Sequence, residues 1–271
     1  MLNKVKYTTH DLDVNGNVPW TKEENEVWKT LYHRQIDIVK GRACPEFIVG
    51  LEKLNLPQDR ISQPHEVSKV LKATTGWSIE PVSAVIPAKE FFTLLANKKF
   101  PAASFIRTMD DLDYLQEPDI FHEIFGHCPL LTNQAYADFV ESYGKMALNA
   151  DPKQGQLLFR VFWYTIEFGL IHTIEGIRIL GGGILSSHEE TLLAVKKNHS
   201  IYLEFKTIEA LRTPFRIDIV QPQYFVLGGY DSLYNNLREE LFKKIEIDEK
   251  LGDYAPTFEY EKESKNAKNN L

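Results

Sequence analysis

Apolar positions recur at helical spacing along most of the chain, and local start signals mark where helices begin. Thr21 and Glu24 can form a capping box, and the apolar residues after them share one face: Val27, Trp28, Leu31 and Val39. A helix is therefore predicted from Thr21. A second capping box, Ser187 with Glu190, and similar periodicity elsewhere predict helices over residues 45–54, 64–72, 87–96, 133–148, 187–197 and 232–251.

A longer helix is predicted to begin at Asp151, which is followed by a proline suited to a first helical turn. This helix carries Glu167 within a nearly continuous apolar run. Glycines follow at Gly169, Gly176 and 181–183, and we expect them to act as weak points or as the stop.

Strand-like sequence is confined to two segments. Residues 77–87 hold β-branched side chains between prolines, and residues 215–226 alternate apolar and polar positions. The pattern predicts one mostly α domain over residues 20–260 with minor β structure. The polar residues 1–19 predict an extended or mobile N-terminal arm, and the charged residues 261–271 predict a disordered tail.

Composition narrows the classes of partner. The 271 residues carry a net charge of −7 with a pI of about 5.7, which argues against binding a nucleic acid backbone. The sequence has neither a signal peptide nor an uninterrupted apolar stretch that could span a bilayer, so we expect no membrane partner and a cytoplasmic location. Cys44 and Cys128 give no disulfide framework and are interpreted as reduced thiols.

The segment 118–129 holds the strongest candidate chemistry. His122 and His127 are five residues apart, and Glu123 adjoins the first of them within an apolar run. Five steps along an α-helix rotate by about 140°, so a continuous helix would not direct both rings at one ion. Because Gly126 and Pro129 flank His127, we predict that the helix unwinds there and that both rings converge.

A third ligand is predicted at Glu167, because a carboxylate in so apolar a run is normally paired or bound to a metal. Two histidines and one carboxylate form the facial triad of non-haem Fe(II) oxygenases, which leaves positions open for oxygen. The zinc-protease motif spaces its histidines four apart. The five-residue spacing here disfavours a zinc hydrolase but leaves it as an alternative.

Several separated blocks together resemble the pterin-dependent aromatic amino acid hydroxylases. The resemblance extends over about residues 20–237 and is carried by Arg107 and by residues 118–130, 162–170, 183–187 and 221–226. Within that family the chain is most similar to short bacterial members that hydroxylate phenylalanine. The resemblance implies a single catalytic domain of the hydroxylase type.

The resemblance also implies residue roles. His122, His127 and Glu167 would hold Fe(II). Glu123 would be a catalytic residue beside the iron that also contacts the pterin, and Phe91 would stack on the pterin. Substrate binding would fall to Arg107, which grips the carboxylate, to Asp119, which orients that arginine, and to Trp163 and Ser186 in the pocket. The simpler interpretations are a solvent-facing Glu123, a surface salt bridge for Arg107, and core packing for Phe91 and Trp163.

The reaction implied is hydroxylation of L-phenylalanine to L-tyrosine by O2 in phenylalanine catabolism, with a tetrahydropterin (tetrahydrobiopterin or a relative) as electron donor. Tyrosine-hydroxylating members of the family carry an Asp at the position that aligns with Ile217. An apolar Ile217 would offer a phenolic hydroxyl no partner, which favours phenylalanine. An alignment shifted by one residue, to Asp218, would reverse that inference. Tyrosine or tryptophan hydroxylation is the alternative within the family. Outside it, the alternatives are a zinc hydrolase using Glu123 and a non-catalytic metal-binding helical protein. The protein is expected to be a monomer or homodimer.

Overall fold

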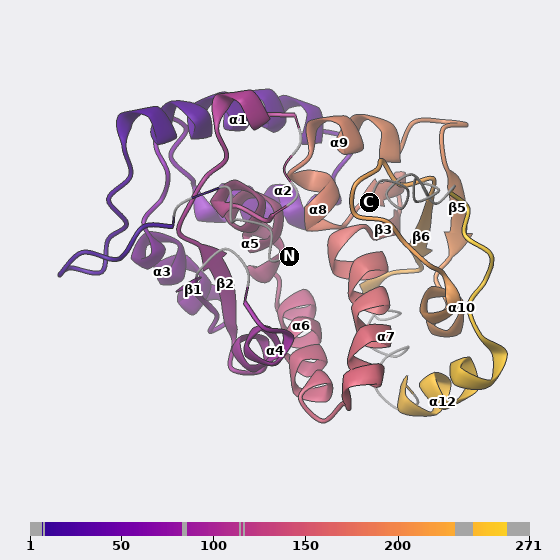
Figure 1. Ribbon diagram of the computed structural model, residues 1–271. Coiled ribbons are helices and arrows are strands. Elements are labelled where there is room, and N and C mark those ends of the chain that lie inside the picture. Colours follow the sequence, from indigo (N-terminus) through magenta and orange to yellow (C-terminus); the bar gives the residue numbers. More distant parts are fainter. Residues whose placement is uncertain are drawn as a thin grey trace, which may run out of the picture.

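Helices make up most of the molecule, with two small sheets set among them (Figure 1). The computed structural model describes residue 7 and residues 9–82, 86–113, 115, 117–230 and 241–258. Its helices are α1 (Lys22–Val39), α2 (Pro45–Leu54), α3 (Pro64–Thr74), α4 (Ala88–Ala96), α5 (Cys128–Leu131), α6 (Gln134–Ala147), α7 (Pro152–Phe162), α8 (Gly182–Leu185), α9 (His188–Ala194), α10 (Thr207–Arg212) and α12 (Leu241–Leu251). The fold class predicted from the sequence, mostly α with minor β structure, is confirmed.

The helix starts predicted from local signals are confirmed. Glu24 N donates to Thr21 Oγ1 at 3.2 Å, and Thr21 N donates to Glu24 Oε2 at 2.7 Å, so the capping box of α1 is complete. α2 and α3 each begin at a proline, Pro45 and Pro64, whose missing N–H costs nothing in the first turn. Asn133 caps α6 by accepting from the backbone of its first turn.

The long helix from Asp151 ends at Glu167 and does not continue toward the later glycines. After Glu167 the chain forms an antiparallel hairpin of β3 (Leu170–Thr173) and β4 (Gly176–Ile179). Gly176 has φ +106°, a conformation that L side chains rarely adopt, and it lies at the turn of this hairpin. The prediction of a weak point at Gly176 and a stop at 181–183 in this helix is therefore wrong.

Two further boundaries differ from the expectation. α9 ends at Ala194, and its capping box is half formed because Ser187 accepts from Glu190 N while the Glu190 carboxylate turns to other partners. In the segment 215–226 only the end is a strand, β6 (Gln223–Leu227). Within the range predicted for the last helix, residues 241–251 are helical, whereas 232–240 and the tail 261–271 lie outside the described residues.

The strands form two sheets on either side of the helical centre (Figure 1). β1 (Ser78–Val82) pairs in parallel with β2 (Lys99–Ala103), which confirms a strand in the segment 77–87. The larger sheet has the order β4-β3-β6-β5, where β5 is Ile201–Glu204. β6 is parallel to both of its neighbours, with Leu170 opposite Val226 and Tyr202 opposite Tyr224.

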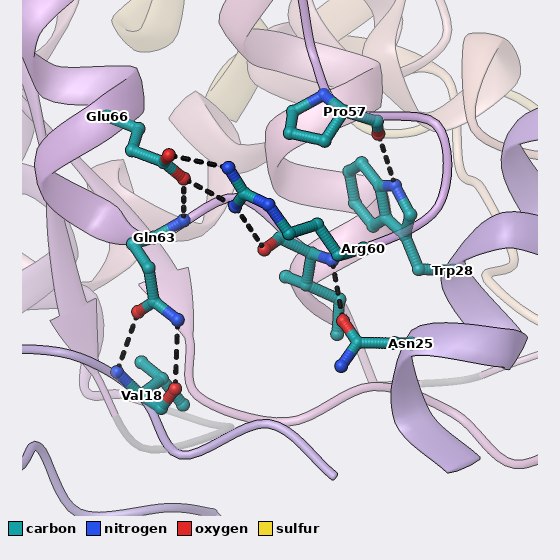
Figure 2. Close-up of polar contacts among 8 residues, drawn as sticks. Val18, Asn25, Trp28, Pro57, Arg60, Gln63 and Glu66 are labelled. Carbon is teal, nitrogen blue, oxygen red and sulfur yellow. Dashed lines mark hydrogen bonds and ion pairs between the residues drawn. The ribbon is translucent and has the colours of Figure 1, made fainter. Parts of the chain in front are cut away.

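The arm before α1 is fastened to the loop that joins α2 and α3 (Figure 2). The Gln63 side-chain amide accepts from Val18 N at 2.8 Å and donates to Val18 O at 3.0 Å. Trp28 Nε1 donates to Pro57 O at 2.8 Å, which fixes the same loop against α1. Backbone groups that no helix or strand could satisfy are thus satisfied by side chains.

Close packing of α2 on α5 provides a test of this arrangement. A Cβ added at Gly50 would lie 2.0 Å from Pro129 O, whereas one added at Gly155 in α7 would meet nothing within 4 Å. Gly50→Ala should lower the free energy of unfolding by about 1–3 kcal/mol through overpacking. Gly155→Ala should raise it by up to about 1 kcal/mol through helix propensity. Urea unfolding measures both, and equal stability of the two variants would contradict the packing described.

Candidate metal centre

His122 and His127 lie on a π-helical segment, η2 (His122–His127). In a π turn the N–H bonds to the carbonyl five residues back, and Cys128 N donates to Glu123 O in that way. A five-residue spacing is therefore close to one turn, and both rings face the same side. The predicted unwinding at Gly126 is wrong, because the helix widens there and continues directly into α5.

Glu167 lies at the end of a second π-helical segment, η3 (Trp163–Glu167), which continues α7. Here Phe168 N donates to Trp163 O at 2.7 Å, again over five residues. π turns are rare and occur frequently at functional sites. Both segments that carry candidate ligands depart from α geometry in the same way.

The three candidate ligands converge, as the sequence indicated. His122 Nε2 and His127 Nε2 are 3.1 Å apart, and Glu167 carboxylate oxygens lie 3.3 Å from His127 Nε2 and 3.6 Å from His122 Nε2. Their ligand atoms all lie within 4.8 Å of one another, and no other such group occurs among the described residues. One ion could be shared by all three.

Ser186 fixes the protonation of His122. The Ser186 hydroxyl donates to Gly182 O at 2.8 Å, so the same oxygen accepts from His122 Nδ1–H at 2.9 Å. That bond leaves Nε2 of His122 as the unprotonated nitrogen facing the other two ligands. Burial lowers the pKa of His122 to about 4, although Glu167 opposes this shift, so the ring is neutral at pH 7.

The glycines 181–183, expected to stop a helix, instead make room for the centre. A Cβ at Gly182 would lie 2.4 Å from His127 Nδ1, and one at Gly183 would lie 2.9 Å from Glu167 Oε2. Any larger residue would displace a ligand side chain. Sequence reasoning missed this role, and the run of three small residues was its only signal.

Arg107 and Asp119 form a buried ion pair beside this centre. The Asp119 carboxylate accepts three hydrogen bonds from Arg107: from Nε at 2.8 Å, from Nη2 at 3.0 Å and from the backbone N at 3.0 Å. The remaining lone pair of Asp119 accepts from His122 N at 3.0 Å. Although burial raises the pKa of Asp119, the guanidinium and these N–H groups hold it below its usual value. The surface-salt-bridge interpretation of Arg107 is wrong, since its side chain is 7% exposed.

A cavity of about 500 Å³ opens beside the centre. Among the residues that line it are Arg107, His122, Trp163, Glu167, Ser186, Ile217 and Asp218. Trp163 also stacks on two rings, Phe168 at 4.2 Å and Phe215 at 4.4 Å between centroids, so it is both packed and exposed to the cavity. The structure therefore assembles metal candidates and substrate candidates around one space.

Glu123 and Phe91 do not line that cavity. Glu123 is buried, its carboxylate accepts from Ala103 N, and burial raises its pKa well above the usual value. The solvent-facing interpretation of Glu123 is therefore wrong. The Phe91 ring packs edge-on against Phe162 at 5.4 Å, and Phe162 does line the cavity, so Phe91 lies one side chain behind its wall.

Two imidazole nitrogens and one carboxylate oxygen beside an open cavity define a class of site. This is the donor set of the facial triad in mononuclear non-haem iron oxygenases. A zinc hydrolase would need Glu123 as a base facing the metal and the substrate. Because Glu123 is tied to the backbone of β2 outside the cavity lining, the geometry disfavours that alternative.

Comparisons with known proteins agree with this class. A sequence model described as biopterin-dependent aromatic amino acid hydroxylase matches residues 3–248. Phenylalanine-4-hydroxylase of Pseudomonas aeruginosa is 48% identical over 95% of this chain and 98% of its own length. The apo structure of the phenylalanine hydroxylase from Colwellia psychrerythraea superposes with a TM-score of 0.89 at 50% identity, covering 93% of this chain and 98% of that one.

A Chromobacterium violaceum phenylalanine hydroxylase structure with bound oxidised Fe(III) is also similar, with a TM-score of 0.85 and 37% identity over 90% of this chain and 91% of that one. The chain therefore belongs to the biopterin-dependent aromatic amino acid hydroxylases. The family predicted from the sequence blocks is confirmed.

The buried Arg107–Asp119 pair gives a stability prediction. Asp119→Asn leaves a buried guanidinium without its counter-charge, so the free energy of unfolding at pH 7 should fall by about 3–5 kcal/mol. The folded pKa of Asp119 is depressed, so its stabilisation is complete above the ordinary value of about 3.9 and is lost as the pH falls through the lower folded pKa. The difference between wild type and variant should therefore narrow on acidification.

Urea unfolding at several pH values makes this measurement. Asp37 on α1 serves as the matched control, because its ion pair with Lys40 is exposed to solvent. Asp37→Asn should leave stability unchanged, as expected for a solvent-screened pair. A similar loss in the two variants would show that burial of the Arg107 pair has no special effect.

Proposed function

We propose that this chain hydroxylates L-phenylalanine to L-tyrosine with O2, using Fe(II) and a tetrahydropterin, either tetrahydrobiopterin or a related compound. The observation that carries the proposal is the convergence of His122, His127 and Glu167 at a cavity, in a chain 48% identical to a phenylalanine-4-hydroxylase. Bound iron would activate O2, of which one atom would enter the ring and the other would leave as water; two of the four electrons would come from the reduced pterin and two from the substrate C–H bond.

The residues present fit such an iron. His122 reaches the centre through a nitrogen whose lone pair is freed by the Ser186 bond, and Glu167 contributes an anionic oxygen. The glycine run leaves these side chains enough space. We therefore assign the three side chains as iron ligands and Ser186 as the residue that orients His122.

Arg107 is the proposed anchor for the substrate carboxylate. A guanidinium can donate two parallel hydrogen bonds to a carboxylate, and Asp119 holds this one in place at the cavity wall. Trp163 and Phe162 give the aromatic ring an apolar surface and exclude water from it. Ser186 lies at the same wall, where the amino acid backbone would pass.

Phenylalanine is preferred to tyrosine because positions 217 and 218 of the cavity wall offer a phenolic hydroxyl little to bond with. Ile217 lines the cavity and is half exposed to it. Asp218 beside it is bonded by Arg216 Nε at 2.9 Å, so its carboxylate is neutralised by a local ion pair. A buried hydroxyl left unpaired costs about 1–3 kcal/mol. Tyrosine and tryptophan remain the alternative substrates of the same family.

We infer that Glu123 and Phe91 belong to the pterin side of the centre, with Glu123 as the catalytic residue beside the iron. Glu123 directly follows His122, and its carboxylate holds the end of β2 through Ala103 N. Phe91 supports Phe162 from behind. Phe91 thereby lies one side chain from the cavity, and Glu123 adjoins in sequence a residue that lines it.

We extend the proposal to the domain organisation, the location and the partners of the protein. Residues 20–260 form the catalytic domain after an arm at 1–19, and the protein acts in the cytoplasm in phenylalanine catabolism as a monomer or homodimer. Its partner is a small amino acid, with no nucleic acid and no membrane. Among the described residues, none of the helices combines the length and the apolar character needed to cross a bilayer.

Substrate choice is tested by assaying purified protein with Fe(II), tetrahydrobiopterin and each of phenylalanine, tyrosine and tryptophan. Oxygen uptake and chromatographic detection of the hydroxylated product should give the highest kcat/KM with phenylalanine. Preference for tyrosine or tryptophan would overturn the substrate assignment within the family. Iron binding without any turnover would favour the non-catalytic alternative.

Metal binding is tested on the ligands and on Ser186. His122→Ala, His127→Ala and Glu167→Ala should abolish stoichiometric iron binding while helical circular dichroism is retained. Ser186→Ala should lower the affinity for iron about 10–100-fold, because the His122 ring loses the hydrogen bond that orients it. His172→Ala in the exposed part of β3 is the control and should bind iron normally. Full iron occupancy in any ligand variant removes that residue from the set.

A further inference from the structure

One wall of the cavity is a segment that is neither helix nor strand. Residues 216–220 lie between α10 and β6, and the cavity is lined by Ile217, Asp218, Ile219 and Val220 from this segment. A segment without regular secondary structure needs hydrogen bonds from other groups to keep one conformation. Gln221, the next residue, supplies them.

Gln221 is buried, with 3% of its surface exposed. Its side-chain nitrogen donates to Arg216 O at 2.8 Å and to Ile219 O at 2.9 Å, so one amide group bridges both ends of the segment. Both hydrogens of the amide are used within the segment. The carbonyl spacing of residues 216–219 is thereby set by a single side chain.

The same side chain joins the segment to Trp163, which also lines the cavity. Gln221 Oε1 accepts from Trp163 Nε1 at 3.4 Å, and the Phe215 ring, just before the segment, stacks on Trp163 at 4.4 Å. Both ends of the segment therefore contact one cavity-lining indole. Trp163 belongs to η3, the π segment that also carries Glu167.

The backbone of Gln221 is fixed as well. Gln221 N donates to Glu190 Oε1 at 3.0 Å, and that carboxylate also accepts from Tyr224 Oη. Because the Glu190 carboxylate makes these two bonds, it does not complete the capping box of α9. Gln221 is thus held rigidly while it holds the segment.

We propose that Gln221 is a positioning residue that determines which aromatic ring the cavity accepts. The proposal rests on the amino acid hydroxylation proposed above and extends it to the origin of selectivity. The wall presents Ile217 and Val220, and its only ionised group is neutralised by Arg216. Holding this wall at a fixed distance from Trp163 sets the space for a phenyl ring and restricts the larger indole ring.

Gln221→Met tests the proposal, because methionine has a similar length and no amide. The ratio of kcat/KM for phenylalanine to that for tryptophan should fall roughly tenfold, which is the size of discrimination that the shape of an apolar pocket can produce. The Kd of phenylalanine for the Fe(II) protein, measured by calorimetry without pterin, should rise. Iron content and the KM for tetrahydrobiopterin should stay at the wild-type values.

Gln63→Met is the matched control. Its amide also makes two hydrogen bonds to backbone groups, both on Val18, and it does not line the cavity (Figure 2). It should lower thermal stability and leave the substrate ratio unchanged. Equal changes of the ratio in the two variants, or a wild-type ratio in Gln221→Met, would overturn the proposal.

Gln221→Glu is the second variant, used if Gln221→Met does not fold. It keeps an acceptor for Trp163 but loses both donors to the segment, and the same fall in the ratio is expected. A folded Gln221→Glu with the wild-type ratio also overturns the proposal. Wild-type assays come first: absence of phenylalanine hydroxylation there defeats the proposed function, whereas a selective wild type with equally selective variants defeats only the role of Gln221.

Discussion

The convergence of two imidazoles and one carboxylate in an apolar interior is the constraint on which the rest of the structure depends. Burying three such groups is costly unless each polar atom has a partner. Two π turns direct the side chains of His122, His127 and Glu167 to one point, and glycines 181–183 leave the space that they need. The Ser186 bond then decides which nitrogen of His122 faces the centre.

Asp119 joins this centre to Arg107 at the cavity wall. One carboxylate accepts from the Arg107 guanidinium, from its backbone and from the backbone of His122. Arg107 and the first residue of η2 therefore share one carboxylate. Glu123 in the same segment accepts from Ala103 N, so two carboxylates, at positions 119 and 123, hold Arg107 and Ala103 beside η2.

Much of this architecture was predictable where the cause is local. A capping box at Thr21 and prolines at Pro45 and Pro64 fix helix starts within four residues of sequence. The convergence of the three candidate ligands was also predicted from the sequence, because a lone carboxylate in an apolar run is conspicuous. The π turns, the glycine run and the Gln221 amide were missed, because each is explained by contacts with residues distant in the sequence or by a helix register that periodicity does not reveal.

The π turns have a consequence for stability. An α-helix would separate His122 from His127 by about 140°, so the wider turn exists at a local cost in backbone geometry. Desolvation of His122 and Glu167 adds to that cost. An ion that binds only the folded state offsets both terms, and its contribution grows with the logarithm of the free ion concentration over its Kd. The folded state and the loaded centre are therefore linked equilibria, and residues that orient ligands, such as Ser186, act on both.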